Sequence, residues 1–219
     1  MASNSAIDRI LRSGLVSILR APSSQGLVDV AEALLAGGVD VIEVTFTVPG
    51  AHRVVEQVAD RLGDRIVLGA GSILDTETAR IAMLSGAKFL VAPTVNLEVI
   101  EMCRRYGVPV MPGAMTPTEV LTAWQAGADV VKVFPSEVTG PAHIKAIHGP
   151  LPQIPLMPTG GVNVKTAGEF LRAGAAALGV GGSLASAKDI AEGNLKKIEN
   201  AARQLIEVIQ KTRAEMAKE

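Results

Sequence analysis

The chain has few aromatic residues and almost no excess charge. Only 3% of its 219 residues are Phe, Trp or Tyr, so aromatic platforms for stacking nucleic-acid bases are not expected. The formal net charge of −1 provides no overall field that would hold a polyanion or an anionic membrane. We therefore expect no nucleic-acid and no membrane partner, and any anionic ligand must bind at a local site.

Cysteine, histidine and long apolar runs are also scarce. The single cysteine, Cys103, permits no internal disulfide and is typical of a reducing compartment. The opening segment MASNSAIDRILRSG lacks the apolar core of a signal peptide, and no stretch approaches the roughly 18 apolar residues of a membrane span. The three histidines show no ligand-type spacing. These features predict a cytoplasmic protein without a bound metal or cofactor.

Aliphatic residues and glycines are abundant and follow a regular pattern. Hydrophobic residues make up 48% of the chain, and glycines recur just ahead of short apolar runs. The eight glycines of this pattern are Gly14, Gly38, Gly63, Gly86, Gly107, Gly127, Gly149 and Gly174. The runs that follow them cover residues 15–19, 39–43, 66–68, 89–91, 108–111, 130–134, 154–157 and 176–180. Their β-branched composition predicts buried parallel strands.

The segments between these runs have helical periodicity, and each glycine is expected to end a helix in the left-handed conformation. Asp75 and Thr116 are expected to cap the helices that follow them. Eight strand–helix units in this length predict a closed (β/α)8 barrel, with an open doubly wound sheet as the alternative. We expect one domain over residues 1–219, ending in an amphipathic helix at about 193–219 whose tail, 211–219, is a solvated helix end.

Strand register indicates a buried lysine among the predicted strands. With a period of two, Val131 and Val133 share one face of their strand, and Lys132 and Phe134 share the other. If the valines pack beneath the helices, Lys132 points into the barrel, where burial lowers the pKa of its amine and frees it to form a Schiff base. A structural ion pair is the alternative. Lys88 precedes its strand, so we expect it at the amino-terminal end of the barrel, where residues serve stability rather than catalysis.

A carboxylate is expected beside this amine. Alternation places Glu43 and Thr45 on the inward face of the second strand, so that Glu43 can move protons during the chemistry of an imine. The alternative is a salt bridge between Lys132 and Glu43 that merely fills the barrel, but buried ion pairs stabilise poorly compared with apolar replacements.

Potential anion-binding groups cluster at the carboxyl ends of the predicted strands. Arg20 ends the first strand and suits a carboxylate or phosphate, although a surface arginine tied to an acidic loop residue would look the same. Glycine clusters at 158–162 and 179–183 follow the seventh and eighth strands, which is the usual phosphate cradle of such barrels, although Gly-Gly can also mark a turn. Ser72 could bind a substrate hydroxyl or cap the next helix.

Several ordered motifs resemble one enzyme family over about residues 10–194. They are Leu19-Arg20, Ile42-Glu-Val-Thr45, Gly69-Ala-Gly-Ser72, Ala92-Pro93, Met111-Pro-Gly113, Val131-Lys-Val-Phe-Pro135, Pro158-Thr-Gly-Gly161 and Gly181-Gly-Ser183. The chain resembles the 2-keto-3-deoxy-6-phosphogluconate (KDPG) and 4-hydroxy-2-oxoglutarate (KHG) aldolases, which are class I, Schiff-base enzymes on a (β/α)8 barrel.

The resemblance implies a role for each matching residue. Lys132 would form the Schiff base with pyruvate, and Glu43 would be the general acid and base. The residues implied to line the phosphate or carboxylate pocket are Thr159, Gly160, Gly161, Gly182 and Ser183, and those implied to complete the site are Arg20, Thr45, Ser72, Pro93 and Phe134. The implied substrates are a keto acid and a phosphorylated aldehyde, and the implied assembly is a homotrimer.

One position departs from the family pattern. Some members carry an arginine two residues after the threonine of the Glu-Val-Thr motif, where this chain has Thr47. The balance between the phosphogluconate-derived and the smaller hydroxy-oxoglutarate substrate is therefore left open. Two other functions also remain open at this point: a phosphosugar isomerase or epimerase that uses Glu43 as base, and an assembly subunit with a vestigial pocket.

Overall fold

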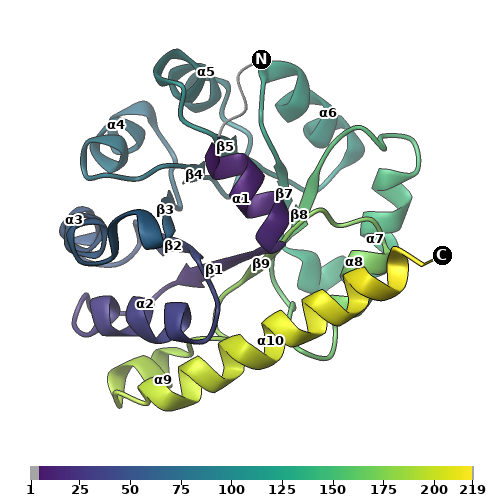
Figure 1. Ribbon diagram of the computed structural model, residues 1–219. Coiled ribbons are helices and arrows are strands. Elements are labelled where there is room, and N and C mark those ends of the chain that lie inside the picture. Colours follow the sequence, from purple (N-terminus) through teal and green to yellow (C-terminus); the bar gives the residue numbers. More distant parts are fainter. Residues whose placement is uncertain (1–4, 219) are drawn as a thin grey trace.

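The computed structural model describes residues 5–218 and shows short strands at the centre, surrounded by helices (Figure 1). The strands are β1 Leu15–Leu19, β2 Val41–Thr45, β3 Val67–Gly71, β4 Leu90–Val91, β5 Val110–Met111, β6 Gly113–Ala114, β7 Val131–Val133, β8 Leu156–Pro158 and β9 Leu178–Val180. The helices are α1 Ser5–Ser13, α2 Leu27–Ala36, α3 Ala51–Leu62, α4 Thr76–Leu84, α5 Leu97–Tyr106, α6 Pro117–Ala126, α7 Ser136–His148, α8 Ala167–Arg172, α9 Ala187–Ala191 and α10 Leu195–Met216, with a 3-10 turn, η1, at Gly63–Arg65.

All strand pairs are parallel, and the sheet curls. Six strands lie in the order β5-β4-β3-β2-β1-β9, and three more in the order β6-β7-β8. The last strand therefore pairs with the first, which contradicts the order reversal of an open doubly wound sheet. The expected run 108–111 is followed by a separate strand, β6, because Pro112 between β5 and β6 has no N–H group to donate to a ladder.

Alternating side chains divide the core into two layers. The inner face of the curled sheet carries one apolar cluster: Val16, Val41, Val67, Phe89, Val91, Met111, Val130, Met157 and Ala177. The outer face packs beneath the helices in a second and larger cluster that includes Val131 and Val133. The predicted register of the Lys132 strand is thus confirmed.

Helix α1 covers the amino-terminal end of the strands, and the sequence analysis does not predict it. Ala6 and Ile10 belong to the inner cluster, and Ile7 and Leu11 pack against it. In Figure 1 this purple helix lies over the centre of the molecule, across the strands. The three- and four-residue spacing of these apolar residues is the signal that could have revealed the helix.

The predicted helix ends are largely confirmed. The Asp75 side chain accepts a hydrogen bond from Thr78 N–H at the start of α4, and Thr116 forms a reciprocal capping box with Glu119 at the start of α6. Of the eight patterned glycines, Gly149 is the exception, because its φ of −52° lies in the right-handed region.

Helix α10 packs against α2 and α8 on the outside of the molecule (Figure 1). The prediction that residues 211–219 form only a solvated helix end is wrong for its first residues, since Thr212 is buried and Arg213 donates hydrogen bonds to Arg12 O (2.8 Å) and Ala176 O (2.7 Å). Residues 1–4 of the opening segment and Glu219 lie outside the described residues. No helix in the described part of the chain is long and apolar enough to cross a membrane.

Candidate active site

Lys132 and Glu43 lie on the inner face of the curled sheet, both deeply buried. Lys132 is in the middle of β7 and 4% exposed, and Glu43 is in the middle of β2 and 1% exposed. Both stand nearer the carboxyl ends of their strands than the valines of the inner cluster, Val130 and Val41. An amine and a carboxylate therefore share the end of the sheet opposite α1.

Burial shifts the pKa of each group toward its neutral form. Loss of solvent lowers the pKa of Lys132, the positive charge of Arg20 lowers it further, and Glu43 opposes both effects. Loss of solvent raises the pKa of Glu43, against the attraction of Lys132 and Arg20. A neutral amine is a nucleophile, and a carboxyl group with a raised pKa is better suited to give a proton as well as to take one.

The two groups do not neutralise each other in a salt bridge. No ion pair between Lys132 and Glu43 occurs in the described structure, and the buried Glu43 Oε2 atom has no hydrogen-bond partner within residues 5–218. The structural plug considered from the sequence is therefore not formed. An unpartnered buried oxygen is costly unless a water or a ligand serves it, which indicates a functional group.

Gly71 provides the space in which the Glu43 carboxyl group lies. A Cβ atom built on Gly71 would overlap Glu43 Oε1 and would approach its Cγ to 2.8 Å. Gly71 is on the neighbouring strand, β3. Glu43 pairs in register with Gly69, and Gly71 lies two residues further along β3 on the same face. In the sequence, Gly71 stands out only as part of the motif Gly69-Ala-Gly-Ser72, which does not reveal its partner across the strands.

Phe134 and Arg20 flank the lysine. The Lys132 Nζ atom lies 4.8 Å from the centre of the Phe134 ring, in cation–π distance. Arg20 follows β1, is exposed, and forms no ion pair with any described residue. The alternative in which an acidic loop residue holds Arg20 is therefore not observed, and its guanidinium remains available for an anion.

Thr45 lies at the carboxyl end of β2 beside Thr47, the residue that differs from the family pattern. Thr45 Oγ1 donates a hydrogen bond to Leu19 O (3.2 Å) and lies 2.9 Å from Thr47 Oγ1. Thr45 is fully buried, whereas Thr47 is exposed. The two hydroxyl groups thus connect the inner face of the sheet with the solvent at its mouth, beside Arg20.

The two glycine clusters form adjacent loops after β8 and β9. A parallel bridge joins Thr159 to Gly179, and Ser183 Oγ donates a hydrogen bond to Val162 O (2.7 Å). The backbone N–H groups of Gly161, Gly182 and Ser183 donate no hydrogen bond within residues 5–218.

The glycines leave the backbone of both loops accessible to a ligand. Gly160 and Gly161 have positive φ angles of 94° and 72°, and a Cβ atom on Gly182 would have no neighbour within 4 Å. Free N–H groups on adjacent loops are the donors that an anion requires.

Ser72 and Pro93 occupy the loops after β3 and β4. Ser72 has a φ of 61°, and no other non-glycine residue in the described structure has a positive φ, a conformation that is often maintained at functional sites. The N-cap of α4 is Asp75, so the alternative that Ser72 caps this helix is wrong. Pro93 is half-buried, and its carbonyl group lies against Gly113.

The histidines lie away from these residues. His52 is in α3, and His143 and His148 are in α7, where the His143 Nε2 atom forms a 2.7 Å hydrogen bond with Met115 O. Within the described residues no group of three or more His, Cys, Asp or Glu side chains is placed to hold a metal ion. Cys103 is buried in α5, and burial raises the pKa of its thiol to about 12, as suits a packing residue.

Comparisons with known proteins identify the family of this lysine-based site. The model of the KDPG and KHG aldolase family matches residues 7–201. The 2-dehydro-3-deoxy-phosphogluconate aldolase of Treponema pallidum is 32% identical over 206 residues, which cover 93% of this chain and 96% of that protein.

Two solved structures are also similar. A KDPG aldolase from Legionella pneumophila, with pyruvate captured as a covalent carbinolamine intermediate, has a TM-score of 0.85 and 26% identity and covers 92% of this chain and 98% of its own. A cube-shaped protein cage, designed by fusing symmetric oligomeric domains, has a TM-score of 0.86 and 29% identity and covers 94% of this chain and 75% of its own.

The fold and the buried amine define a class I lyase that works through a lysine and pyruvate. The chain belongs to the KDPG and KHG aldolase family. Family membership favours the lyase over the two other functions considered from the sequence, an isomerase or epimerase and an assembly subunit with a vestigial pocket.

Proposed function

We propose that this protein cleaves KDPG to pyruvate and glyceraldehyde 3-phosphate through a Schiff base on Lys132, and KHG to pyruvate and glyoxylate in the same way. The observation that carries this proposal is the buried Lys132 amine, which faces a buried Glu43 carboxyl group without forming an ion pair. The family match and the similarity to a structure holding a pyruvate carbinolamine support it.

The proposed mechanism uses Glu43 as the single proton carrier. The neutral Lys132 amine attacks the C2 ketone of the substrate to form a carbinolamine, and Glu43 protonates its hydroxyl group, which leaves as water and yields the iminium ion. Glu43 then removes the proton of the C4 hydroxyl group. The C3–C4 bond breaks, its electron pair forms the C2=C3 bond while the π pair of the iminium moves onto nitrogen to give an enamine, and the aldehyde departs.

The second half of the cycle restores the lysine. The enamine takes a proton at C3, with Glu43 as the proposed donor, and water then hydrolyses the resulting pyruvate iminium ion. The Phe134 ring is expected to stabilise the cationic nitrogen and to limit the access of water to it.

Trapping of the imine tests the mechanism. Borohydride reduction in the presence of pyruvate should give a covalent adduct on the peptide that contains Lys132, detected by mass spectrometry. Lys132→Met should abolish both adduct and turnover with little change in stability, while Lys88→Met, which removes an exposed lysine, should retain both. An unmodified wild-type protein, or continued cleavage by Lys132→Met, would sink the proposal.

We also propose that the two glycine loops hold the phosphate group of the substrate. The unused N–H groups of Gly161, Gly182 and Ser183 support this assignment, with Thr159 and Gly160 completing the loop walls. Arg20, Thr45, Ser72 and Pro93 would then contact the keto-acid end and the hydroxyl groups. Comparing cleavage of KDPG and KHG by Gly182→Asp tests the assignment, because the added carboxylate should repel phosphate and impair KDPG cleavage more.

At a larger scale, we infer that the described strands close into one (β/α)8 barrel and that the chain forms a single domain. The parallel bridges Leu156↔Ala175 and Thr159↔Gly179 support the barrel, because they join the three-stranded sheet to β9 and its approach. A single cooperative unfolding transition followed by several probes would support one domain.

The proposed assembly is a homotrimer, and the proposed location is the cytoplasm. Similarity to a cage designed from symmetric oligomeric domains supports an oligomer. Light scattering on the purified protein should give the mass of three chains, and a monomeric mass would contradict this proposal. Cell fractionation checks the location.

A further inference from the structure

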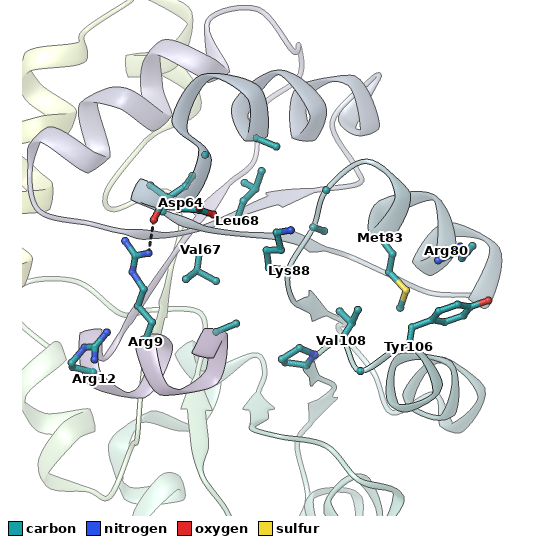
Figure 2. Close-up of a pocket in the computed structure, with 18 residues that line it drawn as sticks. Arg9, Arg12, Asp64, Val67, Leu68, Arg80, Met83, Lys88, Tyr106 and Val108 are labelled. Atoms are coloured by element: carbon teal, nitrogen blue, oxygen red, sulfur yellow. Dashed lines mark hydrogen bonds between the residues drawn. The ribbon is translucent and has the colours of Figure 1, made fainter. Parts of the chain in front are cut away.

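A second concave region lies at the opposite end of the strands from Lys132. This cavity of about 870 Å³ is bounded by α1, by η1 and by the last turns of α3, α4 and α5 (Figure 2). Cavities that hold small organic ligands have volumes of about 300–1,000 Å³. The cavity is therefore large enough for a metabolite-sized molecule and does not share its lining with the proposed active site.

The charged residues that line this cavity are mostly cationic. Arg9, Arg12, Arg80 and Lys88 face one carboxylate, that of Asp64, although the chain as a whole carries a net charge of −1. The excess of positive charge is thus local to this cavity. Because the chain as a whole is nearly neutral, any anion must be attracted by such a local concentration of charge.

The cation Arg9 has a structural role. Its Nε atom lies 2.7 Å from Asp40 Oδ2 in an ion pair, and its Nη1 and Nη2 atoms donate to Asp64 O and Arg65 O. These contacts fix α1 to the turn after α3 and make Arg9 part of the cavity wall. Arg9 therefore contributes little free charge.

Three cations remain without an acidic partner. Within the described residues, the side chains of Lys88, Arg12 and Arg80 form no hydrogen bond or ion pair, and the Arg80 guanidinium lies 4.3 Å from the centre of the Tyr106 ring. Figure 2 shows Lys88 in the middle of the cavity, with Arg12 at the α1 end and Arg80 beside Tyr106 at the other end. This spacing suits an elongated anion better than a compact one.

Helix ends offer a competing explanation, since α3, α4 and α5 point their carboxyl ends at this cavity and basic residues there stabilise helices. Several carbonyl groups in their last turns, however, have other partners. Ala82 O and Cys103 O accept backbone N–H groups just beyond α4 and α5, and Arg65 donates to Arg61 O at the end of α3. Lys88 and Arg80 are therefore not needed to satisfy these carbonyl groups.

We propose that this cavity binds an elongated organic anion that carries at least two separated negative charges, with Lys88 as the central counter-charge and Arg12 and Arg80 at the ends. Phosphate or carboxylate groups would supply the charges, and the apolar wall of Val67, Leu68, Met83 and Val108 would contact the carbon chain between them. Binding here does not depend on the lyase chemistry at the other end of the strands.

The sole tyrosine of the chain, Tyr106, provides a local probe. Uniform 3-fluorotyrosine labelling gives a single ¹⁹F resonance at the rim of the cavity. Titration at constant ionic strength with fructose 1,6-bisphosphate, adipate and inorganic phosphate compares separated phosphates, separated carboxylates and a compact anion. A saturable shift is expected with at least one of the two elongated probes, at a lower concentration than with inorganic phosphate.

Matched variants assign the binding to the cavity. Lys88→Gln should raise the apparent Kd about tenfold or more, because it removes a charge-assisted contact, and Arg12→Gln should raise it as well. Lys211→Gln makes the same change on the exposed face of α10 and should have no effect, and Lys132→Met should leave the titration unchanged even if the proposed lyase function fails. A shift that does not saturate, or one that is equal in Lys88→Gln and wild type, would overturn the proposal.

Discussion

Arg20 influences Lys132 through its positive charge. Burial is the main cause of the lowered pKa of Lys132, and the guanidinium of Arg20 adds to it. Arg20→Gln should therefore raise the pKa of Lys132 back toward its ordinary value, so that the free amine appears only at higher pH. The rate at which a neutral acylating reagent modifies Lys132, followed against pH by peptide mass spectrometry, measures this change.

The control for this measurement is Arg53→Gln, which removes an exposed guanidinium from α3. Its pH profile should match that of the wild type. A midpoint that is the same in Arg20→Gln and Arg53→Gln would show that Arg20 does not affect the lysine.

Gly71 is expected to act as a positioning residue for Glu43. Gly71→Ala would place a methyl group where Glu43 Oε1 lies, and the carboxyl group would have to move. Because Lys132 is untouched, borohydride should still trap pyruvate at long incubation, although more slowly because Glu43 also assists loss of water from the carbinolamine, while kcat falls by about a hundredfold or more, the usual contribution of a general acid–base group. Steady-state assays and trapping on the same preparation measure the two effects.

A second substitution separates positioning from a general loss of structure. Glu43→Asp shortens the side chain and vacates the space beside residue 71, so Gly71→Ala/Glu43→Asp should be more active than Gly71→Ala alone. Gly149→Ala is the matched control, since its Cβ atom would make only ordinary contacts, at 3.6 Å or beyond. A double variant less active than Gly71→Ala would contradict the steric argument.

At the scale of elements, α1 contributes stability at the end of the sheet away from the reactive lysine. Ile10 is fully buried in the inner cluster. Ile10→Ala should lower the free energy of unfolding by about 2–5 kcal/mol, through lost burial and the cavity left behind, with kcat nearly unchanged. Urea denaturation measures this loss, and Ile81→Ala, at a site 49% exposed on α4, should cost far less.

The elements also show how far sequence patterns reach. The period of two correctly placed Lys132 and Glu43 on the inner face, because each position depends only on its own strand. The contact between Gly71 and Glu43 could not be predicted, since it depends on pairing between two strands. Helix α1 was missed although the spacing of its apolar residues carries the signal, and Gly149 departs from the left-handed conformation that the repeat of glycines predicts.

At the scale of the whole molecule, Arg213 joins three distant parts of the chain. It extends from α10 to the end of α1 and to the approach to β9, through carbonyl groups of Arg12 and Ala176. Arg213→Ala should lower the free energy of unfolding by about 1–3 kcal/mol, because two carbonyl groups, of which that of Ala176 is partly buried, lose a charged donor. Thermal or urea unfolding checks this value against Lys211→Ala, which alters an exposed neighbour and should change it little.

The contact made by Arg213 also has a consequence for immobilising the protein. It places the last turns of α10 beside Arg12 and Ala176, at the amino-terminal end of the strands. The proposed active site around Lys132 faces the carboxyl end of the strands. A bead, a surface or a fused carrier attached after α10 would therefore lie at the end of the molecule opposite the proposed active site. Substrate would reach the mouth from free solution, and the support would not obstruct its diffusion.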